Sequence, residues 1–146
     1  GIQDAWNLGW KLASAIRTGD PGILGSYETE RLPVAADMLN LTKTLHVNRS
    51  TKRGELTNQL GLDYRGSPLS IGDPSGGFVP GDRVSDRRLP DGRRLLEAMR
   101  HGGATLLLRP SGDNILVRPD GYVAQITPDR PATYAGLDVV QIGVAD

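Results

Sequence analysis

Residues 1–17 read GIQDAWNLGWKLASAIR, and their apolar spacing is that of an α-helix that begins almost at the first residue. One helical face carries apolar side chains every three to four residues: Ala5, Leu8, Leu12 and Ala15 or Ile16. Gly9 interrupts that face at a cost of about 1 kcal/mol relative to alanine, so we expect another backbone to pack closely there. The stretch predicts an amphipathic helix whose apolar face needs a partner.

Two tryptophans and a glycine refine this prediction. Trp6 and Trp10 lie four residues apart, and we interpret them as packing aromatics in preference to a platform for a ligand. Arg17 suits the negative end of the helix dipole, and Gly19 can take the left-handed position that follows a helix. The first helix is therefore predicted to end near residue 18.

A second helix follows at once. Asp20 and Pro21 supply an N-cap and a first-turn proline. Helical spacing then continues from Ile23 to about His46. One apolar face recurs within it: Val34, Met38, Leu41 and Leu45. Pro33 lies inside this stretch, so we expect a kink or a break near Arg31–Leu32.

Composition limits the function classes. The 146 residues suffice for one ordinary domain or for a helical arm plus a small domain. Seventeen basic and seventeen acidic residues cancel, so net charge favours neither nucleic acid nor an anionic membrane as a partner. The absence of cysteine excludes disulfides, thiolate catalysis and Cys-based metal sites. No apolar run reaches the ~20 residues of a membrane span, and no signal peptide is visible, so we expect a soluble, cytoplasmic protein.

Beyond the helices the composition changes. Residues 51–62 are predicted to form a further short helix, and residues 63–82 are rich in Gly, Pro and Ser, as in a linker or an extended loop wrapping a surface. We therefore divide the chain into a helical part (1–62), a linker (63–82) and a small domain (83–146). The Gly-rich GDPSGGF at 72–78 lacks the strand–helix context and the lysine of a phosphate loop, so phosphate binding there is disfavoured.

The small domain has α/β character. Gly92–His101 is predicted to be an amphipathic helix with Leu95, Leu96 and Met99 inward, and Ala104–Arg109 is predicted to be a buried strand. Ile115–Arg118 and Tyr122–Ile126 flank Pro-Asp-Gly, which predicts a β-hairpin closed by a type I turn with a bulge. Leu137–Val144 reads as one more strand.

Two blocks carry a resemblance. GIQDAWNLGWKLA, followed by SYETERLPVA, resembles the end of the FAD domain in aromatic-ring flavoprotein monooxygenases related to p-hydroxybenzoate hydroxylase and phenol hydroxylase. PGDRVSDRRLPDGRRLLEAMRHGGATLLLRP, with ILVRPDGYVA, is similar to the C-terminal thioredoxin-like domain of the longer members, such as the polyketide hydroxylases. The order of the strands departs from that pattern, because DVVQIGV normally precedes the hairpin and here follows it. The expected fold is a helical arm plus a small thioredoxin-like α/β domain without cysteines.

The resemblance implies a function for a longer parent protein, of which we expect this chain to be the C-terminal piece. Such a parent binds FAD, is reduced by NADPH or NADH, and uses dioxygen to hydroxylate an aromatic small molecule, the flavin supplying the chemistry. Its helix N-terminus stabilises negative charge on the reduced flavin. Gly1 and Ile2 are then the rim of the flavin site. Asp4 matches the acidic residue of the family pattern, or alternatively interacts with the first-turn amides.

Several functions are not expected of the piece itself. No GxGxxG follows a strand, so we expect it neither to retain FAD nor to be active alone, and no catalytic residue is assigned. His46 and His101 have no partner at metal spacing, so no metal is expected. The alternating charges over residues 82–94 favour an ion-paired surface, or else an anchor onto the FAD domain. Homo-oligomerisation is a further expectation, and the alternative function is a free-standing, non-catalytic interaction or dimerisation module.

Overall fold

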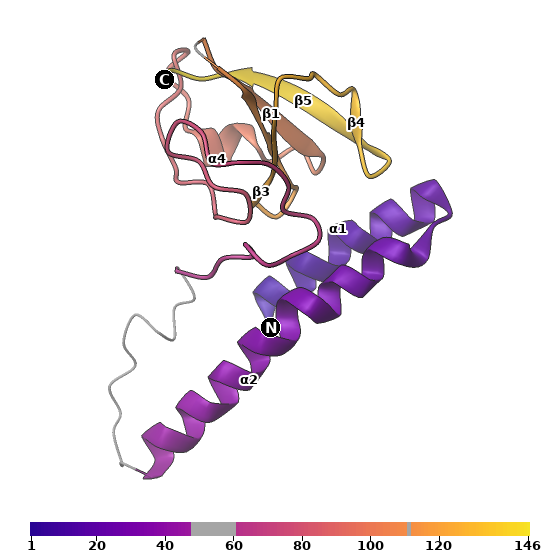
Figure 1. The fold of residues 1–146 in the computed structure, drawn as a ribbon, viewed down its shortest axis with the longest axis vertical. Coiled ribbons are helices and arrows are strands. Elements are labelled where there is room, and N and C mark those ends of the chain that lie inside the picture. Colours follow the sequence, from indigo (N-terminus) through magenta and orange to yellow (C-terminus); the bar gives the residue numbers. More distant parts are fainter. Residues whose placement is uncertain (48–60, 111) are drawn as a thin grey trace.

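The computed structural model describes residues 1–47, 61–110 and 112–146, which form a two-helix arm and a small mixed-sheet domain (Figure 1). The arm comprises α1 (Ile2–Thr18), the 3-10 turn η1 (Pro21–Leu24) and α2 (Gly25–Val47). The small domain comprises α4 (Leu95–Ala98), β1 (Ala104–Leu108), β2 (Asn114–Val117), β3 (Val123–Thr127), β4 (Thr133–Tyr134) and β5 (Leu137–Gly143). The expected α/β architecture with a helical arm is confirmed. Most of the helix expected over residues 51–62 lies outside the described residues.

The ends of α1 follow the sequence signals. Gly19 takes the left-handed conformation (φ 72°), and its N–H donates to the carbonyl of Ala15 at 2.9 Å. The Asp20 side chain accepts from the backbone N–H of Gly22 at 2.8 Å, with Pro21 in the first helical position. η1 thus reverses the chain, and α2 returns alongside α1 (Figure 1).

The expected break near Arg31–Leu32 is wrong, since α2 is one helix from Gly25 to Val47 with Pro33 inside it. Pro33 removes one backbone donor, which leaves the carbonyl of Thr29 without its helical partner. Both residues are exposed, so water can bind that carbonyl. The neighbouring Glu30, Arg31 and Val34 are buried and hold the helix on both sides of the proline.

The two faces of α1 are reversed relative to an ordinary amphipathic helix. The buried face is largely polar, comprising Asn7, Trp10, Lys11 and Ser14. The apolar face is open to solvent: Ile2 is 86% exposed, Leu12 42% and Ile16 82%. The close backbone contact expected at Gly9 is also absent, because nothing in the described chain lies within 4 Å of a Cβ placed there. Polar contacts, not the apolar face, attach α1 to the rest of this chain.

The sheet has the order β3-β2-β1-β5-β4. β1 pairs antiparallel with β2 and parallel with β5. β5 comes after the β2–β3 hairpin in sequence but lies on the opposite side of β1 from it. The hairpin of β2 and β3 is confirmed, with a register shift at Leu116–Val117 and Gly121 in a left-handed turn (φ 86°). The two other strands predicted from the sequence, over residues 104–109 and 137–144, are confirmed as β1 and β5, each within one residue of its predicted ends.

The helix expected over residues 92–101 is mostly wrong, since only Leu95–Ala98 is helical. The preceding residues form a tight turn in which the N–H of Leu89 donates to the carbonyl of Arg93 at 2.8 Å. This turn holds Arg94 extended (φ −87°, ψ 140°) and so delays the helix. Leu95 is fully buried as expected, Met99 is partly buried, but Leu96 is 39% exposed.

Hydrophobic side chains cover both faces of the sheet. One cluster lies between the sheet and the segment from Phe78 to Met99: Phe78, Val84, Leu89, Leu95, Leu107, Ile115, Val117, Val123, Ile126, Ile142 and Val144. A smaller cluster on the other face comprises Ala104, Leu106, Leu116 and Ala124, with Tyr134 packed against it. α1 lies on that second side, where Trp10 stacks on Tyr134 with ring centres 6.1 Å apart.

The segment over residues 63–82 is an extended loop that wraps the small domain, as one reading of its composition predicted. The N–H of Ile71 donates to Ala124 O, and the N–H of Gly81 donates to Val123 O, both at 2.8 Å. The loop thereby continues the sheet beyond β3, while Tyr64 and Ser67 at its start are buried. The domain limits at 62 and 82 stay a prediction.

Gly81 tests how tightly this loop is fixed. Its φ is +93°, and a Cβ there would collide with the backbone of Tyr64 and Arg65. Gly92 has nearly the same φ, +88°, but nothing within 4 Å of its Cβ position. We expect Gly92→Ala to cost about 1–2 kcal/mol from the left-handed backbone alone. Gly81→Ala should lower the free energy of unfolding by a further ~1–3 kcal/mol, because the added Cβ overpacks the loop. Urea denaturation measures both variants, and equal losses for Gly81→Ala and Gly92→Ala would show that the Cβ at position 81 meets no obstacle.

Candidate functional site

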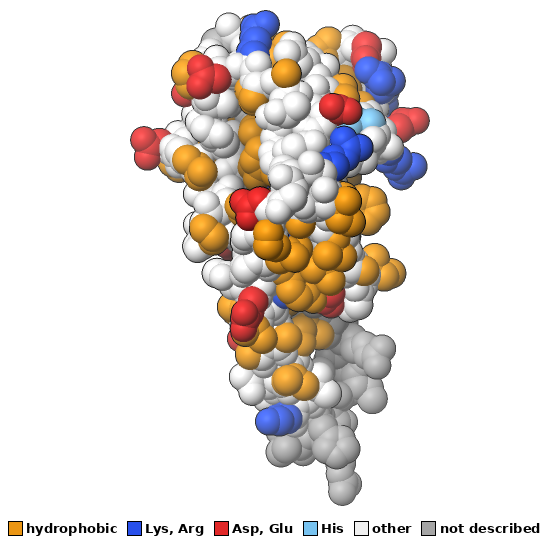
Figure 2. All heavy atoms as spheres, turned by 90° about the vertical axis from the view of Figure 1, so that its right-hand side faces the viewer, with side chains coloured by type: hydrophobic (Ala, Val, Ile, Leu, Met, Phe, Trp, Pro, Cys, Tyr) orange, Lys and Arg blue, Asp and Glu red, His pale blue; other side chains and the backbone are white. Residues whose placement is uncertain are grey.

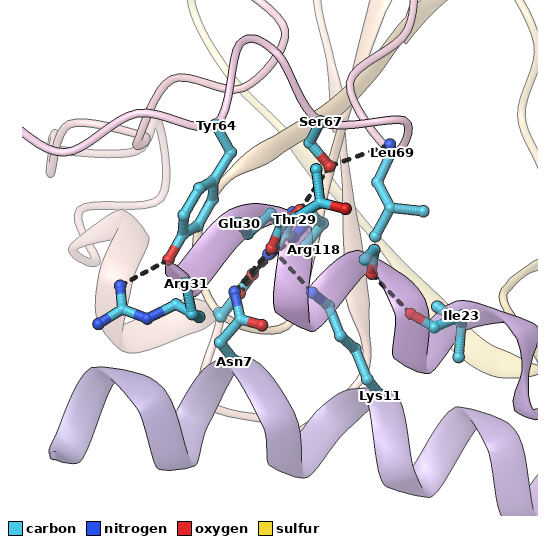
Figure 3. Close-up of polar contacts among 12 residues, drawn as sticks. Asn7, Lys11, Ile23, Thr29, Glu30, Arg31, Tyr64, Ser67, Leu69 and Arg118 are labelled. Carbon is cyan, nitrogen blue, oxygen red and sulfur yellow. Dashed lines mark hydrogen bonds and ion pairs between the residues drawn. The ribbon is translucent and has the colours of Figure 1, made fainter. Parts of the chain in front are cut away.

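The most heavily charged buried site joins the helical arm to the small domain. At its centre the Glu30 carboxylate, 1% exposed, accepts five hydrogen bonds (Figure 3). The donors are Asn7 Nδ2 at 2.7 Å, Lys11 Nζ at 2.8 Å, Ser67 Oγ at 2.6 Å, Arg118 Nη1 at 2.6 Å and Arg118 Nη2 at 3.0 Å. We call these five residues the Glu30 cluster. It connects α1, α2, the wrapping loop and the β2–β3 hairpin through one carboxylate.

Arg118 has a second carboxylate partner. Its Nε donates to Asp120 Oδ1 at 2.9 Å and its Nη2 to Asp120 Oδ2 at 2.6 Å. The guanidinium carbon lies 5.2 Å from the ring centre of Trp10, 5.1 Å from that of Tyr64 and 5.6 Å from that of Tyr122. Bidentate pairing and aromatic faces are what a buried guanidinium requires, because both replace its lost hydration.

The surroundings keep this cluster ionised. Burial alone would raise the pKa of Glu30, but hydrogen bonds and charge from Arg118, with those from Lys11 and Ser67, lower the pKa from 4.5 to about 2. Burial lowers the pKa of Lys11, against the opposing effect of Glu30. For Arg118, burial is outweighed by Asp120 and Glu30, which raise its pKa. Glu30 and Arg118 thus remain charged at neutral pH, so they suit a fixed ion-paired contact and not proton transfer.

The residues predicted to form the flavin rim lie together at the start of α1. Gly1 and Ile2 are exposed. The Asp4 carboxylate lies 2.9 Å from the nitrogen of Gly1 and accepts from Arg31 Nε at 2.7 Å. Hydrogen bonds from Gly1 and Arg31 lower the pKa of Asp4. Arg31 in turn donates to Tyr64 Oη at 3.0 Å, which ties this end of α1 to the wrapping loop.

A pocket of about 300 Å³ lies beside the same end of α1. Its walls come from α1, from the segment around α4 and from the β2–β3 turn: Ile2, Gln3, Trp6, Leu96, Met99 and Tyr122 among them. Gln3 Oε1 is buried and has no hydrogen-bond partner within the described part of the chain. The pocket merges with the exposed apolar face of α1, since Ile2 and Trp6 belong to both.

Three further features concern the charged segment, possible metal ligands and helix hydropathy. The charged segment at residues 82–94 carries exposed ion pairs, Arg65–Asp82, Arg93–Asp91 and Arg94–Asp86, as the alternating signs predicted. Among the described residues, no three His, Cys, Asp or Glu side chains lie close enough to hold a metal ion. In that same part of the chain, no helix has both the length and the hydropathy to cross a membrane.

Sequence reasoning missed the Glu30 cluster. Glu30 and Arg118 are 88 residues apart, and no local motif or spacing singles out either of them as buried. A partial signal was present in α1, where Asn7 and Lys11 lie one turn apart opposite the apolar face. That spacing could have indicated a buried polar face, but not its partners.

Comparisons with known proteins bear on the arm and on the small domain. Residues 1–42 match the family described as an FAD binding domain. A flavin-dependent monooxygenase of Mycobacteroides abscessus is 40% identical over 111 residues, which cover 73% of this chain and 23% of that protein. Pentachlorophenol 4-monooxygenase of Sphingobium chlorophenolicum is 35% identical over 132 residues, or 76% of this chain and 24% of that protein.

A solved structure is similar over nearly the whole chain. The rebeccamycin biosynthetic enzyme RebC with reduced flavin superposes with a TM-score of 0.65 and 26% identity, covering 93% of this chain and 39% of that one. Arm and small domain are thus matched together. The chain spans about a quarter of the length of these curated relatives.

Proposed function

We propose, on the premise that the chain is related to the FAD-dependent aromatic monooxygenases, that it contributes the last helices of an FAD-binding domain and a small domain docked onto them. The match of residues 1–42 to the FAD binding domain carries this proposal. The whole protein would hydroxylate an aromatic compound, with NADPH or NADH as reductant and dioxygen as co-substrate. A relative named for pentachlorophenol supports an aromatic substrate. No observation favours the free-standing module.

The start of α1 fits the role of the flavin rim. Gly1 is the N-cap of α1 and has no side chain to accept from the first-turn amides, so within the described residues no N-cap side chain bonds to them. Free backbone N–H groups and the positive end of the helix dipole suit an anionic ring edge. Gly1 and Ile2 would lie at this edge, with the nitrogen of Gly1 already paired with Asp4, while Asp4 and Arg31 hold the helix end in place. FAD, when bound, would supply the redox and oxygen chemistry.

The exposed apolar face of α1 is the surface that the remainder of the FAD-binding domain would cover. Figure 2 shows hydrophobic side chains gathered over the helical pair, below the small domain. The large exposed ones on α1 are Ile2, Trp6, Leu12 and Ile16. Exposed apolar surface of this extent is typical of interaction sites. Since the chain spans about a quarter of the length of its curated relatives, the remainder of the FAD-binding domain would be the partner of this face.

Flavin content tests the proposal directly. We expect the complete gene product to be yellow, with about one FAD per chain, and to oxidise NADPH or NADH faster when an aromatic substrate is added. The 146-residue chain, titrated with FAD and followed by flavin fluorescence, should show no saturable binding. A colourless gene product that binds no FAD would remove the assignment.

The open apolar face should also make the chain self-associate. We expect the double substitution Leu12→Lys, Ile16→Lys to lower self-association in sedimentation velocity, because it removes apolar surface from a face with no partner. Its effect on the free energy of unfolding should stay within about 0.5 kcal/mol, as for other surface sites. Val140→Lys, at a 39% exposed position on β5, is the matched control and should leave association unchanged. If the double variant and Val140→Lys self-associate equally, the surface that mediates self-association is not the apolar face of α1.

A further inference from the structure

The small domain contacts α1 at four levels along one face. Near the N-terminus, Trp6 Nε1 donates to Pro119 O at 3.1 Å. Asn7 and Lys11 reach the small domain indirectly, since both donate to Glu30 of α2, which pairs with Arg118. Trp10 then stacks on Tyr134. Trp10 lies on the buried, largely polar face of α1, and the exposed Trp6 reaches the small domain through its indole N–H.

Toward the C-terminus, Ser14 Oγ donates to the carbonyl of Ala135 at 2.6 Å. The side chain of Thr18 lies against Gly136, so close that a Cβ on Gly136 would collide with it. Ala135 and Gly136 form the β4–β5 turn with φ of 50° and 72°, a left-handed pair that presents the Ala135 carbonyl to α1. Two turns of the small domain therefore hold α1 at positions 6 and 14, about 12 Å apart at 1.5 Å per residue.

We propose that the small domain is a clamp that sets the axial position and the rotation of α1, with Arg118 and Ser14 as positioning residues. Resting on the proposed function, this makes the small domain the part that places the first-turn amides of α1 relative to the flavin. A domain without cysteine cannot act on the flavin by thiol exchange. In this proposal its effect on the reaction is geometric.

The chemistry of the contacts favours positioning over simple adhesion. Apolar packing tolerates sliding and rotation, whereas a bidentate guanidinium–carboxylate pair accepts a narrow range of geometries. Arg118 is bidentate to two carboxylates at once, Glu30 of α2 and Asp120 of its own turn. Buried ion pairs add little net stability against apolar residues of equal volume, but in some proteins they fix one arrangement among several. At the same time the apolar face of α1 stays free for the remainder of the FAD-binding domain.

The hydrogen bond from Trp6 gives a direct readout in the chain itself. In Arg118→Met we expect the Trp6 indole N–H to exchange with solvent at least tenfold faster by NMR, while the amides shared by β1 and β5 keep their protection. Arg118→Lys keeps the charge but cannot hold both carboxylates in bidentate geometry, so its exchange should be intermediate. Arg94→Met, which removes an exposed ion pair of the same domain, is the control and should match wild type.

A second variant covers the case in which Arg118→Met does not fold. Lys11→Met, Glu30→Leu, Arg118→Met and Asp120→Asn together remove the buried charges, the carboxylate of Asp120 included, and should retain cooperative unfolding. If this quadruple variant is folded and the Trp6 indole N–H is still protected as in wild type, apolar packing alone positions α1 and the clamp is overturned. Loss of that protection in a folded variant supports it.

The link to the flavin needs the complete gene product. There, Ser14→Ala and Arg118→Lys should shift the flavin midpoint potential to more negative values, because reduced, anionic flavin loses stabilisation from the α1 dipole. Arg94→Met should leave the potential unchanged. If variants in which the Trp6 indole N–H is unprotected keep the wild-type flavin potential, the flavin-positioning role is overturned, but the clamp on α1 is not. Absence of flavin from the gene product would overturn the proposed function, whereas the exchange result in the 146-residue chain would still decide the clamp.

Discussion

Glu30→Ala is expected to lower the free energy of unfolding by about 3–5 kcal/mol, the largest single-residue loss that we predict for this chain. The substitution removes the acceptor of five hydrogen bonds. Lys11 loses the carboxylate that its buried ammonium contacts at 2.8 Å, and Arg118 keeps only Asp120. Removal of one partner from a buried ion pair typically costs this much, because an uncompensated charge stays in a medium of low polarity. Urea denaturation followed by far-UV circular dichroism measures the loss.

The control is Asp86→Ala, which removes an exposed ion pair of similar length together with one hydrogen bond from the backbone N–H of Leu96. Water screens the Asp86–Arg94 pair, so its loss should be small beside that of Glu30. Glu30→Gln should fall between the two, since the amide oxygen still accepts hydrogen bonds while the charge is lost. A similar loss for Glu30→Ala and Asp86→Ala would show that the Glu30 cluster is open to water.

Acid should weaken the fold through the same carboxylate, and this is the second large effect. The pKa of Glu30 is about 2 in the folded chain, against 4.5 for an ordinary glutamate. Between these two pKa values the unfolded chain binds the proton and the folded chain does not. The free energy of unfolding therefore decreases as the pH falls. The contribution is fully present above pH ~4.5 and is lost as the pH approaches 2. At roughly 1.4 kcal/mol per pH unit, the loss is about 3 kcal/mol.

Urea midpoints measured between pH 7 and pH 2.5 test this dependence. Other carboxylates contribute as well, since hydrogen bonds lower the pKa of Asp4, Asp86 and Asp91. Glu30→Gln keeps those three groups and removes only Glu30, so its stability should fall less steeply below pH 4.5 than that of wild type. Parallel curves for the two proteins would mean that Glu30 does not titrate as its contacts require.

Local features of the fold could be predicted from the sequence because short-range signals define them. Gly19 ends α1 and Asp20-Pro21 starts η1, since the relevant hydrogen bonds join residues two to four apart. Pro-Asp-Gly fixed the β2–β3 hairpin in the same way. The resemblance of the first block to an FAD domain was also a property of local sequence, and the match of residues 1–42 supports it.

Predictions that needed a tertiary partner were less successful. The apolar stripe predicted a helix correctly, yet the stripe could not indicate that this chain buries the opposite face of α1. Pro33 was expected to break α2, but packed neighbours hold the helix across it. The helix over residues 92–101 was shortened by a turn at Leu89–Arg93 that its helical spacing did not register.

The sequence by itself determined the end of α1, the start of η1 and the β2–β3 hairpin, because capping and turn geometry act over a few residues. Only the tertiary structure decided which charges are buried. Glu30 and Arg118 are 88 residues apart, and no motif or spacing in the sequence distinguishes either of them from the exposed glutamates and arginines elsewhere in the chain. A buried ion pair is stable only when several distant donors and acceptors meet at once, and that coincidence is a property of the folded chain.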